Sequence, residues 1–152
     1  MLPTKWSIPK NFGKKLLVLL TAGVLLAGCS STKEISTSSI TQGNCKNQKQ
    51  INNPNEFVSE TAQNLDVVQR GDIITATMDV ETYCNAQISF DVVKNENEIR
   101  LKLKNDSGVK DNCVCTKNVS ISLANVEPGD YNILVTNLSG NQLLLKTTFT
   151  VK

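Results

Sequence analysis

The residues with the clearest chemical potential are five cysteines, and the chain contains no histidine. They stand at Cys29, Cys45, Cys84, Cys113 and Cys115. Without an imidazole, the Ser/His/Asp and Cys/His catalytic arrangements are excluded, as are histidine-ligated zinc and a histidine pH switch. We therefore expect no catalytic residue, no resident metal and no cofactor.

Cys29 differs from the other four cysteines in what precedes it. The first 15 residues carry four lysines and no acidic residue, and an apolar run occupies residues 16–26. A run of eleven residues matches the roughly 7–15 of a secretion signal and falls short of the roughly 20 that a membrane-spanning helix needs. Small residues, Ala27 and Gly28, then lead directly into Cys29. The pattern predicts an exported chain.

The stretch Leu26-Ala27-Gly28-Cys29 resembles the lipobox of bacterial lipoproteins. The resemblance covers residues 1–29 and implies that residues 1–28 are a signal peptide, removed when the Cys29 sulfur carries a diacylglycerol. One acyl chain anchors only marginally, at about 10⁴ M⁻¹, whereas two or three anchor stably. Ser30 follows in place of Asp, which implies the outer membrane if the host has two membranes. A plain signal peptide or a short uncleaved anchor remains the alternative.

Cleavage would change the charge of the chain. The full sequence has 16 basic and 14 acidic residues, and the four lysines of residues 1–28 leave with the signal, so residues 29–152 carry a net charge near −2. Nucleic-acid binding needs a basic excess on one face, so we expect no nucleic-acid partner. The remaining 124 residues suffice for one domain with a core.

Composition divides the exported part in two. Residues 30–44 are rich in Ser and Thr and lack hydrophobic periodicity, so residues 29–44 are predicted to be a lipidated cysteine and a flexible tether. Pairing of part of this stretch as an edge strand is the alternative. The domain is expected to span residues 45–152, opening with a polar, turn-prone segment at 46–55.

A period-two pattern predicts that this domain is all-β. In residues 98–104, Ile99, Leu101 and Leu103 fall on one face and three basic residues on the other. The same alternation runs through 72–84, 86–94, 119–123, 131–135 and 143–151, and short strands are also expected at 57–61 and 66–69. Turn-forming residues separate these runs about every ten residues, which favours a single antiparallel β-sandwich of about seven to eight strands.

Residues 121–135, ISLANVEPGDYNILV, look like a stretch of many immunoglobulin-like bacterial domains, Leu-x-x-(Leu/Val)-x-Pro-Gly-x-Tyr-x-(Ile/Val)-x-Val. This resemblance implies an immunoglobulin-like sandwich in which Tyr131 opens a late strand after the turn at Pro128-Gly129. It carries no implication for function.

The four cysteines of the domain are expected to form disulfides, because an exported chain lives where these bonds persist. Four cysteines allow three pairings. Cys113 and Cys115 lie two apart, on one side of a strand, and a bond between them would close a strained ring. We expect Cys84 to pair with one of them and Cys45 with the other, each bond stabilising the fold by roughly 3–4 kcal/mol. The alternatives are a redox pair or Cu(I) site at Cys113/Cys115, and intermolecular pairing.

Two further patterns have weaker functional readings. Asp106, Asp111 and Asn112 near Gly108 suggest a calcium loop, but their spacing does not fit an EF-hand and a solvated turn is expected. The second is the basic stripe of Arg100, Lys102 and Lys104. It could meet anionic head groups, but a wet face or a protected sheet edge is the expectation.

The functional expectation is therefore a membrane-anchored, non-enzymatic binding or accessory module of a bacterial cell-envelope complex. Its partners would be the membrane, through Cys29, and an envelope protein that the sequence does not identify. One alternative is a lipid-anchored inhibitor or immunity protein that acts through sandwich loops such as residues 105–112. The other is a thiol redox or Cu(I)-binding protein that uses Cys113 and Cys115.

Overall fold

The computed structural model describes residues 34–53, 61–106 and 112–152, which belong to one compact unit, Thr32–Lys152. The described residues form strands and no helix, so they contain no helix able to cross a membrane. The strands are β1 (Ser36–Gln42), β2 (Lys46–Gln50), β3 (Thr61–Arg70), β4 (Ile73–Tyr83), β5 (Gln87–Asn95), β6 (Glu98–Asp106), β7 (Cys113–Ala124), β8 (Gly129–Thr136) and β9 (Leu143–Val151). The all-β prediction is confirmed.

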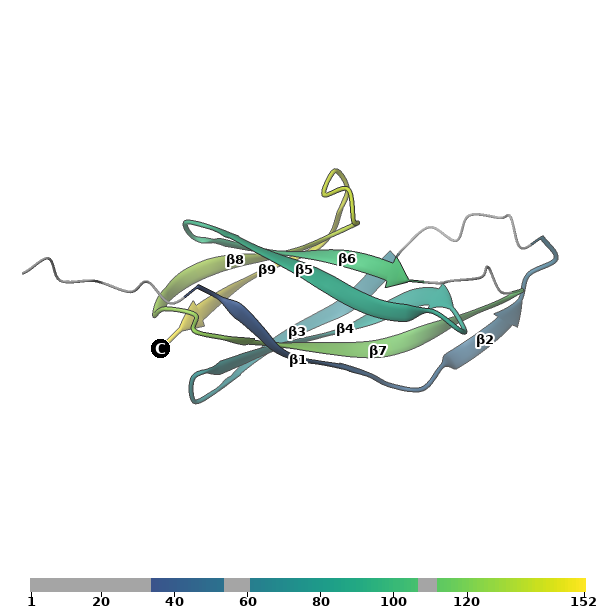
Figure 1. Ribbon diagram of the computed structural model, residues 1–152, viewed down its shortest axis with the longest axis horizontal. Helices are drawn as coiled ribbons and strands as arrows, with labels where there is room; N and C mark the ends of the chain where they lie inside the picture. Colours follow the sequence, from purple (N-terminus) through teal and green to yellow (C-terminus); the bar gives the residue numbers. More distant parts are fainter. Residues whose placement is uncertain (1–33, 54–60, 107–111) are drawn as a thin grey trace, which may run out of the picture. The chain divides into compact units, whose positions relative to one another are not determined.

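Two sheets pack face to face as a β-sandwich (Figure 1). One has the order β1-β7-β4-β3, with β2 also paired to β7, and the other has the order β5-β6-β8-β9. The described part has nine strands, against the seven to eight expected, and β6 and β8 pair in parallel. The parallel pair arises because β7 lies in the other sheet, so the chain reverses twice between β6 and β8.

The core follows the alternation in the sequence. Ile99, Leu101 and Leu103 are fully buried, and the inward residues of β4, β7 and β8 meet them between the sheets. The alternation predicted Leu143 to be an inward residue, and this prediction is wrong because Leu143 is 54% exposed. Leu143 begins β9, an edge strand that pairs only with β8 within its sheet, so little covers its first residue.

The predicted tether at residues 29–44 is wrong from Ser36 onward, because β1 pairs with β7 from Ser36 opposite Ala124 to Gln42 opposite Val119. Backbone pairing holds this strand while most of its side chains stay exposed, with Ile40 alone of the strand packing on the core. The segment expected to be turn-prone at 46–55 likewise contains a strand, β2, whose five residues are all exposed. These strands lack the alternation that revealed the others.

Other strand predictions have mixed outcomes. The short strand expected at 57–61 lies outside the described residues except for Thr61, where β3 begins. The strand expected at 66–69 is the second half of β3. Within residues 121–135, Tyr131 is buried in β8, two residues after Gly129, whose φ of +153° favours glycine.

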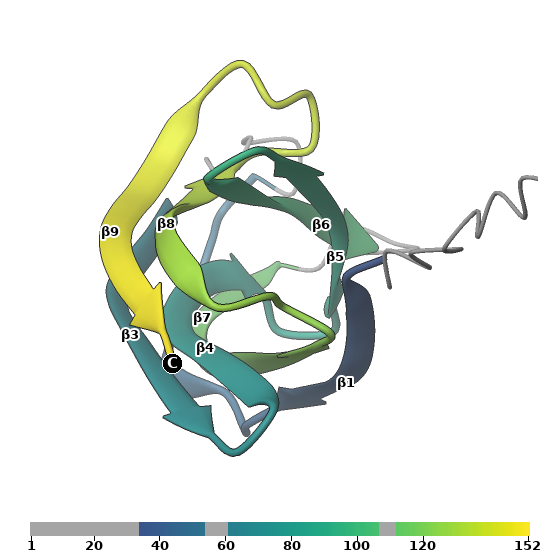
Figure 2. The same cartoon turned by 90° about the vertical axis from the view of Figure 1, so that its left-hand side faces the viewer.

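Glutamine side chains connect the two sheets along both edges. Figure 2 shows the sandwich end on, with β1 beside β5 at one edge and β3 beside β9 at the other. Gln42 of β1 donates through Nε2 to the carbonyl oxygen of Ile88 in β5 at 2.8 Å. On the other edge, Gln69 of β3 exchanges two hydrogen bonds with the backbone of Lys152, at 3.0 and 3.1 Å. These amides satisfy backbone groups that an open edge would leave unpaired.

Candidate functional site at the cystine end

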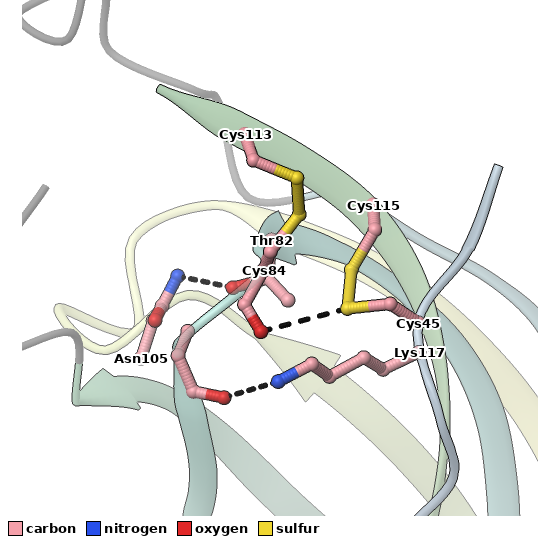
Figure 3. Close-up of a disulfide and its surroundings, with 8 residues drawn as sticks. Cys45, Thr82, Cys84, Asn105, Cys113, Cys115 and Lys117 are labelled. Carbon is pink, nitrogen blue, oxygen red and sulfur yellow. Dashed lines mark hydrogen bonds between the residues drawn. A yellow bond between two sulfur atoms is a disulfide. The ribbon is translucent and has the colours of Figure 1, made fainter. Parts of the chain in front are cut away.

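The four cysteines of the domain meet at one end of the sandwich (Figure 3). Cys113 and Cys115 begin β7, Cys84 follows β4, and Cys45 precedes β2. Cys45 is bonded to Cys115 and Cys84 to Cys113, with Cα–Cα distances of 5.4 and 5.5 Å. The prediction that each of the two neighbouring cysteines takes a distant partner is confirmed. We call this region, with Thr82, Asn105 and Lys117, the cystine end.

Strand alternation explains why polar side chains point inward here. Counting back from Val119, an inward residue of β7, places Lys117, Cys115 and Cys113 on the same inner face. In β4 the inward series continues from Val80 to Thr82, which lies directly opposite Cys115. Our sequence reasoning missed Lys117 and Thr82 as inward residues, although extending the alternation by one step on each strand identifies both.

Thr82 and Asn105 form a hydrogen bond between the two sheets. Asn105 Nδ2, from β6, donates to Thr82 Oγ1 at 2.7 Å, and Thr82 is fully buried. Asn105 Oδ1 is also buried and has no hydrogen-bond partner among the described residues. The hydrogen bond to Thr82 is therefore the one that satisfies this buried amide, and its loss should be costly.

Lys117 brings an ammonium group into the same region. The residue is 8% exposed, and its Nζ donates to the carbonyl oxygen of Ala86. Burial holds the pKa of Lys117 below its ordinary value of 10.5, because removal from water disfavours the charged form. Lys117 is two residues from Cys115 on the inner face of β7, and its ammonium is bonded to the backbone of Ala86.

A second, smaller cluster covers the other side of β7. Tyr83, Ala86 and Val114 pack together with Ile51, which lies just after β2. With this cluster on one face and the disulfides on the other, Cys113 is 9% exposed and Cys115 is 2% exposed. Their partners, Cys45 and Cys84, are half-buried. Each disulfide therefore joins a covered cysteine to a more accessible one.

Three of the four sulfurs form a compact group. The Sγ atoms of Cys45, Cys84 and Cys115 all lie within 4.8 Å of one another. Figure 3 shows the Cys113 sulfur on the far side of Cys84. Cys113 and Cys115 are thus committed to separate bonds, so in this form they are not the free dithiol that the redox or Cu(I) hypothesis at that pair requires.

The basic stripe on β6 is largely neutralised within its own sheet. Arg100 Nη2 lies 2.6 Å from Glu98 Oε1, and Lys104 Nζ lies 2.8 Å from Asp91 Oδ1. The stem of Lys102 runs against Gly140 in the loop after β8. These contacts agree with the expected wet face. The pairs are partly exposed, so each contributes at most about 1 kcal/mol.

The remaining sequence-based candidates lie partly or wholly outside the described residues. Gly108 and Asp111 of the suggested calcium loop are among the undescribed residues, while Asp106 accepts a hydrogen bond from Ser89 at 3.1 Å. The inhibitor hypothesis at 105–112 rests mainly on the same undescribed stretch. Cys29, the expected lipidation site, also lies outside the described residues.

The outer face of the β1-containing sheet carries paired hydroxyls that the sequence reasoning did not single out. Thr75 and Thr77 of β4 bond to Ser122 and Ser120 of β7 at 3.1 and 2.9 Å. Beside them, a hydrogen bond from Asn118 and a weaker effect of a second one from Asn64 hold the pKa of Asp79 below its usual value. Because the hydroxyls satisfy one another, we interpret this face as a structural cross-strand ladder.

Comparison with known proteins identifies no relative of this chain. No family model, no curated protein and no solved structure matches it.

Proposed function

We propose that this chain is a bacterial lipoprotein, anchored through Cys29, whose disulfide-bonded β-sandwich acts as a non-enzymatic binding or accessory module of a cell-envelope complex. The observation behind the proposal is that four of the five cysteines are bridged and the fifth lies in the lipobox-like stretch. The four cysteines of the sandwich pair with one another, which fits an oxidising compartment outside the cytoplasm. The fifth, Cys29, follows Leu26-Ala27-Gly28, where the lipobox resemblance implies a lipid.

The start of β1 limits how far the domain would stand from the membrane. Ser36 is seven residues after Cys29, and seven residues reach at most about 25 Å when fully extended. Ser36 pairs with Ala124, near the end of β7, whereas Cys115 lies near its beginning. The nine residues from Cys115 to Ala124 correspond to roughly 30 Å at about 3.3 Å per residue.

This arrangement favours the cystine end as the part displayed to a partner. The opposite end holds the start of β1, the turn between β3 and β4, and the residues between β7 and β8 (Figure 1). A short connection at that end would keep it near the lipid. The proposal of a non-enzymatic role is supported by the absence of histidine from the sequence.

Metabolic labelling tests the proposal. Bacteria producing the full chain are grown with radioactive palmitate, and the labelled protein is recovered from the membrane fraction. We expect the wild-type chain to carry label and the matched Cys29→Ala chain to carry none. An unlabelled wild-type chain would contradict lipidation. If the label is present, cross-linking of the anchored protein followed by recovery of envelope partners tests the binding role, and Cys29→Ala serves as the control for surface proximity.

A further inference from the structure

We propose that the two disulfides form one exchange-coupled unit, in which the Cys84 thiolate attacks the Cys45–Cys115 bond once a dithiol has opened Cys84–Cys113. The cystine end would then be a thiol–disulfide exchange site whose substrate class is an external dithiol. This inference depends on the geometry of the sulfurs and is independent of lipid on Cys29.

The positions of the sulfurs assign the exchanging role to Cys84. Its Sγ lies within 4.8 Å of both sulfurs of the Cys45–Cys115 bond, and Cys113 is not in this group. A freed Cys84 side chain closes the remaining distance by rotation about χ1. Cys113 has no equivalent approach, because its sulfur lies beyond that of Cys84 (Figure 3).

Burial selects where an external thiol attacks the first bond. Cys84 is half-buried, whereas Cys113 is 9% exposed. One thiolate of the dithiol attacks Cys84 Sγ, forming a mixed disulfide and releasing Cys113 as a thiolate that takes up a proton. The second thiol of the reagent then displaces Cys84, so the reagent ends as a disulfide and two electrons have passed to Cys84 and Cys113.

The internal step then moves the remaining bond without further oxidation or reduction. The Cys84 thiolate attacks Cys115 Sγ, a Cys84–Cys115 bond forms, and Cys45 leaves as a thiolate that is protonated from water. We assign Cys45 as the leaving group because it is half-buried, whereas Cys115 is 2% exposed and a thiolate there would be poorly solvated.

Two variants that lack the same disulfide but keep different thiols provide a matched test. Cys113→Ser leaves Cys84 free, and Cys84→Ser leaves Cys113 free. Each purified protein is held at mildly alkaline pH with a chelator, alkylated with iodoacetamide and mapped by mass spectrometry. We expect alkylation of Cys45 to be at least about tenfold higher in Cys113→Ser than in Cys84→Ser. Equal alkylation of Cys45 in the two variants would overturn the proposal.

The wild-type protein supplies a second measurement that does not depend on how the variants fold. Folded wild type receives one equivalent of dithiothreitol and is then alkylated. Molecules with one remaining disulfide should include the Cys84–Cys115 form, with Cys45 and Cys113 alkylated. If the remaining bond is only Cys45–Cys115 or only Cys84–Cys113, or if both bonds resist the dithiol while the protein is folded, the proposal is wrong.

Discussion

Lys117 places an ammonium group between the sheets with the carbonyl of Ala86 as its bonded acceptor. Because burial lowers its pKa in the folded state, the unfolded chain binds more protons between that lowered pKa and 10.5. The free energy of unfolding should therefore rise with pH through this window. Below the folded pKa both states are protonated and the contribution no longer changes with pH.

Urea unfolding of wild type and Lys117→Met at about pH 7 and about pH 10 checks this linkage. We expect wild type to gain stability relative to Lys117→Met at the higher pH. Lys146→Met, which removes an exposed lysine of β9, is the control and should follow wild type. A stability difference between wild type and Lys117→Met that is the same at both pH values would contradict the effect of burial.

The Thr82–Asn105 bond makes a second prediction at the scale of single residues. Thr82→Val keeps the side-chain shape but removes the acceptor, so the Asn105 amide keeps no side-chain partner among the described residues. We expect a loss of roughly 1–3 kcal/mol in the free energy of unfolding, measured in urea. Thr75→Val removes a part-buried hydroxyl on the outer face and should cost less. Equal losses of unfolding free energy in the two variants would contradict a larger contribution from the buried Thr82–Asn105 bond.

The hydrophobic residues of the sequence predicted which face of each strand points inward, but they did not predict the polar residues on those inward faces. The aliphatic series of β4, β6 and β7 were predicted because each repeats every second residue. Thr82 and Lys117 continue two of these series but have polar side chains, so pattern reading stops before them. The spacing of Cys113 and Cys115 excluded a disulfide between these two cysteines. The closeness of the Cys84 sulfur to the Cys45–Cys115 bond is visible only in the structure.

Among the elements, β1 has a structural role that its composition conceals. It covers one edge of β7 and contributes Ile40 to the core, while Gln42 reaches across to β5. A Ser/Thr-rich edge strand has no hydrophobic alternation because neither face is fully buried. The same holds for β2, whose residues are all exposed. Backbone pairing of this kind depends on the neighbouring strand and is not encoded in side-chain periodicity.

Truncation distinguishes a strand from a tether. A soluble form that begins at Gly43 lacks β1, whereas one that begins at Glu34 keeps it. We expect the shorter form to lose about 2 kcal/mol or more of unfolding free energy, because Ile35 and Ile40 no longer cover the core. Urea unfolding measures the difference. Identical midpoints and slopes for the two forms would mean that β1 contributes nothing to the stability of the domain.

At the scale of the whole molecule, the proposed anchor and the strand order define a near end and a far end. Asp72 lies in the turn before Ile73, which pairs with Ala124 and so marks the end where β1 begins. Lys49 pairs with Val114 at the cystine end. Both side chains are exposed, so they are suitable positions for probes.

Energy transfer to the membrane tests this orientation. The only tryptophan is Trp6, in the expected signal peptide, so Asp72→Trp and Lys49→Trp would each give a lipidated protein with a single tryptophan. In vesicles that contain a dansyl-labelled lipid, we expect stronger transfer from Asp72→Trp than from Lys49→Trp. Equal or reversed transfer would contradict a domain held by a short connection with its cystine end outward.

The mass of the intact protein from the membrane fraction tests the central claim most directly, because it reports the anchor and the disulfides together. We expect a chain that begins at Cys29, is heavier than residues 29–152 by a diacylglycerol with or without a further acyl group, and lacks the hydrogens of the four bridged thiols. A mass that corresponds to the uncleaved chain, or to residues 29–152 without lipid, would contradict it.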